Sequence, residues 1–179
     1  VAIMGWSLGG GVAIFSGWLP LIEKINAQNS FAAHLSIYPP CIAQPRNPIF
    51  TNAPMHILIG ELDSWVPASA CKELSEMAEQ AGSKIGITIY PESHHSFDRE
   101  SAITVKKNAY KTVDCRFEIR DDGAVLMSFL NIPMTTPIRQ KIGLGLCAGK
   151  GPTMGGNPKY REASFKFANQ FMVKHLLSQ

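Results

Sequence analysis

The chain opens on VAIMGWSLGGG, in which four apolar residues lead directly into GWSLG at residues 5–9. Residues 1–5 have the apolar character of a buried parallel strand, and a helix is expected to begin over residues 9–17. A serine between two glycines at a strand-to-helix junction is typical of a sharp turn, where crowded backbone demands small neighbours two positions before and after the serine. The turn would project the Ser7 hydroxyl over the carboxyl edge of a sheet. This junction therefore indicates an α/β fold.

Other glycine-rich turns fit the sequence less well. A dinucleotide-binding turn needs G-x-G-x-x-G, which residues 5–14 do not contain, and they also lack the lysine of a phosphate-binding loop. The stretch GKGPTMGG at 149–156 lacks the lysine-then-hydroxyl ending of such a loop, so we interpret it as a flexible connector. We therefore expect neither an organic cofactor nor a metal ion.

Apolar runs and helical patterns alternate along the first 110 residues. Strands are predicted at 34–39, 55–60 and 84–91, and helices at 67–81 and 98–109, the latter with Asp98 as its N-cap. The stretch 41–54 is expected to be a loop, and a final helix is predicted from Asn157-Pro158 to about Leu177. This order predicts a mostly parallel sheet with helices on both faces. Two extended runs around Asp121-Asp122-Gly123 predict a β-hairpin, so 114–157 is expected to be an insertion within a single domain, 1–179.

A serine becomes a useful nucleophile only beside a base that a carboxylate orients. In this kind of fold the carboxylate and then the histidine follow the serine in the chain, each just beyond a strand end. Asp63 lies three residues beyond the strand at 55–60, and it is preferred to Glu61, which abuts the strand. His94 and His95 both follow the next strand, and spacing alone does not decide between them. The other histidines are interpreted as packing residues: His34, His56 and His175.

Composition limits the partners. The 179 residues carry 17% charged side chains and a net charge of only +3, so a nucleic-acid or membrane partner is not expected, and no apolar run is long enough to span a bilayer. The four cysteines lack zinc-site spacing and are either buried thiols or two disulfides. Among the three connectivities we favour Cys41–Cys71 with Cys115–Cys147. Disulfides would indicate a secreted or periplasmic protein, although a cytoplasmic location stays open.

Three motifs, GWSLGG, GELDSWVP and YPESHHSFD, resemble in this order the dienelactone hydrolase family of α/β-hydrolases. The resemblance covers residues 1 to about 100 and implies Ser7 as nucleophile, Asp63 as orienting acid and His95 as base, since His95 precedes Ser-Phe as the family's base does. It also implies a Cys41–Cys71 disulfide like that of exported relatives. Complete members have further strands before the nucleophile strand, so we expect the N-terminal strands and the second oxyanion donor to lie upstream of this chain, and the isolated fragment to be nearly inactive.

The expected activity is hydrolysis of a small carboxylic ester or lactone through an acyl-enzyme, with the Leu8 N–H as one oxyanion donor. The best-known family members carry cysteine where this chain has Ser7, which favours a general ester over a dienelactone. Trp6 and Trp65 are candidates for an aromatic substrate cleft, although buried core positions are the alternative. A polyester or cutin hydrolase, a peptidase of the same fold, and a non-catalytic binding protein are the rival functions. The sequence does not indicate an oligomeric state.

Overall fold

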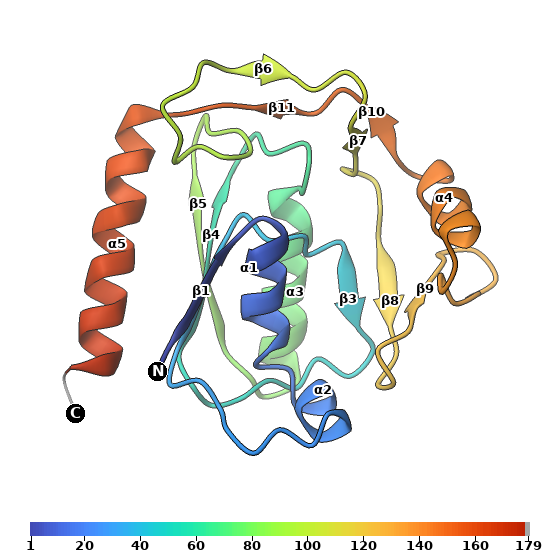
Figure 1. Cartoon of the computed structure of the whole chain (residues 1–179), viewed down its shortest axis with the longest axis horizontal. Coiled ribbons are helices and arrows are strands. Elements are labelled where there is room, and N and C mark those ends of the chain that lie inside the picture. The colour runs from blue at the N-terminus through green and yellow to red at the C-terminus, as the bar shows by residue number, and fades with distance from the viewer. Residues whose placement is uncertain (178–179) are drawn as a thin grey trace.

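Four parallel strands form the central sheet of the computed structural model, which describes residues 1–177 (Figure 1). Their order across the sheet is β1-β2-β4-β5, and every neighbouring pair is parallel. The predicted apolar runs form these strands: β1 (Ile3–Trp6), β2 (His34–Ile37), β4 (Met55–Gly60) and β5 (Ile85–Tyr90). Because consecutive parallel strands point the same way, all four carboxyl ends lie along one edge of the sheet.

Helices cover both faces of this sheet, as the alternating pattern predicts. Figure 1 shows α1 (Leu8–Phe15) and α3 (Ala68–Gln80) on one side and α5 (Pro158–Leu176) on the other. The short α2 (Leu19–Lys24) follows α1. On α3 the buried side chains recur at helical spacing and pack into the core with β4: Ala70, Cys71, Leu74 and Ala78.

The predicted helix at 98–109 is wrong. This stretch is irregular apart from β6 (Thr104–Val105), which pairs antiparallel with β11 (Thr153–Met154). Asp98 does not cap a helix, because its carboxylate accepts a hydrogen bond from the Tyr38 hydroxyl at 2.7 Å. Ile103 and Val105 are exposed, so the segment has no apolar face that a helix could bury.

The insertion contains more structure than the sequence predicts. The expected hairpin forms from β8 (Phe117–Ile119) and β9 (Val125–Leu126), and β8 also pairs with β3 (Ala43–Pro45), which lies in the stretch expected to be a loop. A helix that was not predicted, α4 (Pro137–Gly145), follows the hairpin and is capped by the Thr136 hydroxyl. The connector at 149–156 contributes two short strands, β11 and β10 (Gly149–Lys150), and the latter pairs with β7 (Tyr110–Lys111).

Both predicted disulfides form. Cys41–Cys71 joins the turn after β2 to α3, and Cys115–Cys147 joins the start of the hairpin to the end of α4. These two pairs point to an extracellular or periplasmic protein, because disulfides persist in oxidising compartments. Within residues 1–177, no helix has the length and apolar character needed to cross a membrane.

Candidate active site

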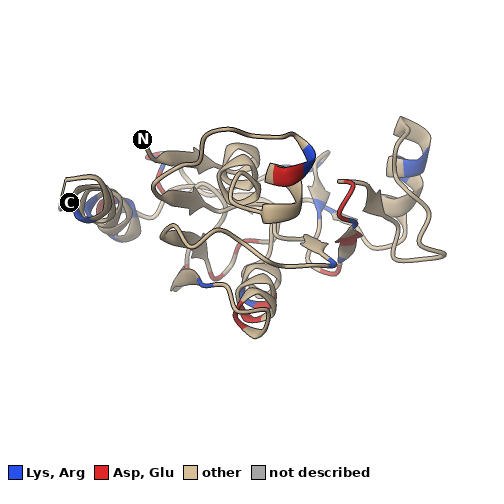
Figure 2. Cartoon of the chain, turned by 90° about the horizontal axis from the view of Figure 1, so that it is seen from below, with Lys and Arg blue, Asp and Glu red and all other residues tan. Residues whose placement is uncertain are grey.

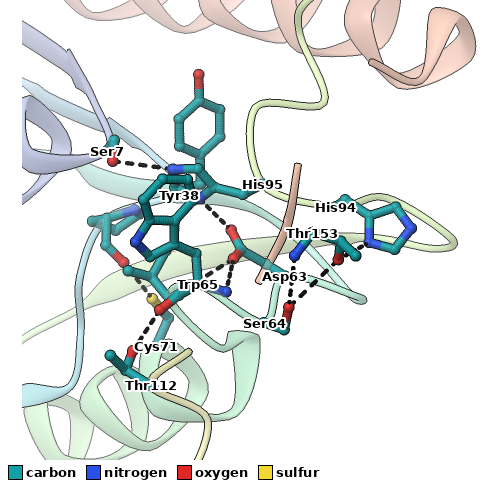
Figure 3. Close-up of polar contacts among 12 residues, drawn as sticks. Ser7, Tyr38, Asp63, Ser64, Trp65, Cys71, His94, His95, Thr112 and Thr153 are labelled. Atoms are coloured by element: carbon teal, nitrogen blue, oxygen red, sulfur yellow. Dashed lines mark hydrogen bonds and ion pairs between the residues drawn. The ribbon is translucent and has the colours of Figure 1, made fainter. Parts of the chain in front are cut away.

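The carboxyl edge of the sheet gathers one side chain from beyond each of its four strands. Ser7 follows β1, Tyr38 follows β2, Asp63 lies beyond β4 and His95 beyond β5. Figure 3 shows these side chains meeting in one cluster, although they are separated by up to 88 positions in the chain. The parallel order of the sheet therefore brings together residues that the sequence places far apart.

Ser7 occupies a strained turn between β1 and α1. Its φ of 50° is in the left-handed region that residues with a side chain rarely adopt, and its amide is held by the carbonyl of Ile37 at 2.9 Å. Gly5 is required, because a Cβ there would lie 2.1 Å from the Gly9 carbonyl oxygen. The expectation that Gly9 must also be small is wrong, since a Cβ at that position meets nothing within 4 Å. At Gly10, by contrast, a Cβ would lie 3.0 Å from the carbonyl oxygen of Ile37 on β2.

Asp63 is buried and both of its carboxylate oxygens are engaged. Oδ1 accepts hydrogen bonds from the backbone N–H groups of Trp65 and Val66, each at 2.9 Å. Oδ2 faces His95 Nδ1 at 2.7 Å. The rejected candidate, Glu61, is exposed and accepts a hydrogen bond from the amide of Glu92. The turn after β4 thus fixes one carboxylate oxygen with backbone groups and leaves the other for the imidazole.

The structure separates the two adjacent histidines. His95 is buried, and its Nε2 lies 3.1 Å from Ser7 Oγ while its Nδ1 contacts Asp63. His94 points away from Ser7, and its Nδ1 lies 2.8 Å from Thr153 Oγ1 (Figure 3). Because an ionised carboxylate can only accept, Nδ1 of His95 carries the proton and Nε2 presents its lone pair to the Ser7 hydroxyl.

Two aromatic rings flank the His95 imidazole. Tyr38 meets it edge-on with ring centroids 4.6 Å apart, and Trp65 lies tilted against it at 5.2 Å. Burial and the hydrogen bond to Asp98 raise the pKa of the Tyr38 hydroxyl well above its ordinary value, so this group stays protonated. Sequence reasoning missed Tyr38, although its place at the carboxyl end of the strand between the serine and acid strands was a usable signal.

The remaining predicted site residues line the same edge. Leu8 is the first residue of α1, and the N–H of a first helical residue has no acceptor within its own helix. The Leu8 side chain and part of the Trp6 side chain are exposed next to Ser7 in the chain. Trp65 is half-buried against His95, so of the two tryptophans only Trp65 has a ring contact with the serine–histidine–aspartate cluster.

The connector at 149–156 braces the loops that carry the cluster. The Thr153 hydroxyl contacts His94, and its amide donates to Ser64 Oγ at 3.2 Å, next to Asp63. The amide of Gly155 donates to the His95 carbonyl at 2.9 Å, and Asn157 holds Phe97 in the same way. This stretch is therefore packed structure that joins the acid loop to the base loop, and no part of the sequence signalled that role.

The other three histidines lie away from this cluster. His34 is buried and Nδ1 contacts the Ala13 carbonyl, while burial lowers its pKa. His56 contacts Thr88 and the ring of Phe167, and burial lowers the pKa of His56 to about 4. His175 packs against Phe171. All three have the packing environment that the sequence predicted. Among residues 1–177, no group of three or more His, Cys, Asp or Glu side chains is arranged to hold a metal ion.

Comparison with known proteins finds solved structures and a family model that each match part of this chain. The structure of Thermogutta terrifontis esterase 2 phosphorylated by paraoxon is 18% identical over 52% of this chain and 43% of its own, with a TM-score of 0.42. MGS-M1, an α/β-hydrolase enzyme from a Medee basin deep-sea metagenome library, is 19% identical over 54% and 40%, with a TM-score of 0.37. This chain therefore spans less than half the length of these structures. No curated protein sequence matches it significantly.

The model of the dienelactone hydrolase family matches residues 1–117. This match covers well over half of the 179 residues, and the chain therefore belongs to that family.

Proposed function

We propose that the protein hydrolyses carboxylic esters or lactones, with Ser7 as nucleophile, His95 as general base and Asp63 as the carboxylate that orients the base. One observation carries the proposal: a continuous line of contacts runs from Ser7 Oγ to His95 Nε2 at 3.1 Å and from His95 Nδ1 to Asp63 Oδ2 at 2.7 Å. Membership of the dienelactone hydrolase family supports the same class of reaction.

The proposed reaction is acyl transfer in two halves. As Ser7 Oγ attacks the ester carbonyl carbon, His95 Nε2 takes the hydroxyl proton, and the carbonyl oxygen becomes an oxyanion. When this intermediate collapses, the bond to the leaving alcohol breaks and the imidazolium returns the proton to the alcohol oxygen. A water molecule then attacks the acyl-serine by the same steps and releases the acid. Asp63 holds the tautomer and stabilises the imidazolium, and the flanking rings of Tyr38 and Trp65 limit the access of water to it.

The substrate class follows from what borders Ser7. The Leu8 N–H at the start of α1 is the proposed donor to the oxyanion, where the positive end of the helix favours negative charge. Trp6 and Trp65 are proposed to contact the substrate through apolar surface. A serine at this position, rather than cysteine, favours general esters over dienelactones.

A fluorophosphonate probe tests the proposal directly. In the full-length protein the probe should label Ser7, and Ser7→Ala should abolish both labelling and hydrolysis of p-nitrophenyl esters. Ser128→Ala is the matched control, since Ser128 is exposed in the insertion, and it should leave both unchanged. Hydrolysis by Ser7→Ala at a rate near that of the unaltered protein would refute the assignment. A parallel panel of lactones, polyester film and peptide amides would then identify the preferred bond.

A further inference from the structure

The helix α4 exposes its apolar side and turns a glycine toward the protein. Ile138, Ile142 and Leu146 follow one another at helical spacing and are 71%, 52% and 56% exposed. About 100° around the helix from the centre of this stripe, Gly143 is buried so closely that a Cβ there would lie 2.3 Å from Met134 Sδ. A surface helix ordinarily buries its apolar stripe against the core. This arrangement leaves the stripe available to something outside the chain.

The turn that precedes α4, residues 128–131, exposes two further large apolar side chains. Phe129 and Leu130 are 62% and 69% exposed. Leu130 and Asn131 have positive φ values of 58° and 51°, a conformation that is disfavoured for residues with a side chain. The backbone on either side of the turn is held by paired hydrogen bonds, Met127 to Ile132 and Met134 to Val125. The turn is thus a defined structure with apolar residues at its tip.

The α4 helix carries two basic residues and no acidic one. No Asp or Glu occurs between Asp122 and Glu162, and Figure 2 shows basic residues without acidic ones on α4. By helical spacing, Arg139 and Lys141 lie on either side of the apolar stripe. The other basic residues of this stretch lie elsewhere: Lys150 contacts the Tyr110 ring, and Lys159 and Arg161 lie on α5, where Arg161 pairs with Glu100.

We propose that α4 and the turn at 128–131 dock on an anionic phospholipid surface, with the helix lying flat in the interface. Apolar side chains flanked by cations on a helix match such a surface, because the aliphatic groups enter the acyl boundary while the cations contact phosphate. A nucleic acid would leave the apolar stripe exposed.

Sedimentation with lipid vesicles tests this proposal on the whole protein with its disulfides intact. The protein should sediment with vesicles of phosphatidylcholine and phosphatidylglycerol but not with phosphatidylcholine alone, and added salt should weaken binding by screening. Ile138→Asn with Ile142→Asn should reduce partitioning roughly tenfold or more, which is about the worth of one buried aliphatic side chain. Arg139→Gln with Lys141→Gln should also weaken binding to anionic vesicles.

Matched controls distinguish docking by this surface from nonspecific hydrophobic or electrostatic binding to vesicles. Ile25→Asn changes an exposed isoleucine elsewhere, and Lys166→Gln with Lys174→Gln removes the same net charge from α5; both should bind as the unaltered protein does. Equal binding by the α4 variants and these controls would overturn the proposal, as would no binding to anionic vesicles. Self-association that the isoleucine variant abolishes, without vesicle binding, would instead assign the surface to a second copy of the chain.

Discussion

At the scale of single residues, the two oxygens of Asp63 have different tasks. Backbone N–H groups of the following turn hold Oδ1, and this leaves Oδ2 directed at His95 Nδ1. The carboxylate therefore orients the imidazole only because its own orientation is fixed by the chain around it. A substitution that keeps the hydrogen bonds to the turn but removes the negative charge facing His95 isolates the contribution of that charge.

Asp63→Asn is that substitution. The amide oxygen can still accept from the turn, but an amide N–H then faces His95 Nδ1, so the imidazole proton moves to Nε2 and the base is lost. We expect kcat for ester hydrolysis to fall by about 10³- to 10⁴-fold with little change in KM. Glu61→Gln, in the same loop, should retain activity, since the exposed Glu61 side chain accepts a hydrogen bond from the Glu92 amide and does not contact His95. Near-normal turnover by Asp63→Asn would remove Asp63 from the mechanism.

The adjacent histidines provide a second matched pair. His95→Asn should lose several orders of magnitude in kcat, because it removes the only imidazole within hydrogen-bond distance of Ser7 Oγ among residues 1–177. His94→Asn should stay within about tenfold of the unaltered protein, since His94 contacts Thr153 and not the serine. Steady-state kinetics on one ester measures both. The opposite ranking would assign the base to His94.

At the scale of elements, a helix or strand could be predicted when its own residues determine it, and not when it forms through pairing with a distant segment. The strand Met55–Gly60 matches its predicted bounds, because a six-residue apolar run between turns has few other stable states. The strand Thr104–Val105 could not be predicted, since it exists through its pairing with residues 153–154, about 50 positions away. The α4 helix was missed although Ile138, Ile142 and Leu146 have helical spacing and Thr136 with Pro137 is a usable helix-start signal.

The same distinction applies to the candidate site. The serine, acid and base could be placed because each follows a recognisable strand in a fixed chain order. Thr153 could not, because its contacts with His94 and Ser64 depend on how the insertion folds back over the sheet edge. Sequence signals thus located the residues proposed to react, whereas the residues that brace them emerged only from the tertiary structure.

The packing of α5 on β4 makes stability depend on pH through His56. Burial against α5 lowers the pKa of His56 to about 4 from an ordinary value of 6.5, and Lys84, Lys174 and His175 line the adjoining cavity of about 590 Å³. Between these pKa values the unfolded chain binds more protons than the folded one, so this contribution to stability is full above pH 6.5 and is lost as the pH falls toward 4.

His56→Gln tests this dependence, because glutamine can still contact Thr88 but does not titrate. Urea unfolding at about pH 7.5 and about pH 5 should show a smaller acid-induced loss of unfolding free energy in the variant than in the unaltered protein. His175→Gln is the comparison, since His175 packs against Phe171 beside the same cavity but is only partly buried. Identical losses in His56→Gln and the unaltered protein would show that the His56 imidazole does not contribute.

At the scale of the whole molecule, two disulfides fasten different parts of the chain: one beside the central sheet and one within the insertion. Cys41–Cys71 closes 30 positions and links α3 to the turn after β2 that begins with Tyr38, beside His95. Cys115–Cys147 closes 32 positions and fastens the end of α4 within the insertion. The two bridges constrain the unfolded chain almost equally, since the loops have nearly the same length. They differ in what they hold in place when the chain is folded.

Removing each bridge should therefore give similar losses of stability but different losses of activity. Cys41→Ala with Cys71→Ala, and separately Cys115→Ala with Cys147→Ala, should each lower the unfolding free energy by about 3–4 kcal/mol, as measured by urea denaturation. Only the first pair should also lower kcat for ester hydrolysis, because the turn that positions Tyr38 against the imidazole is then released. Equal kcat losses from both pairs would mean that the insertion positions the site as firmly as the sheet does, through the contacts of Thr153 and Gly155 with the two loops.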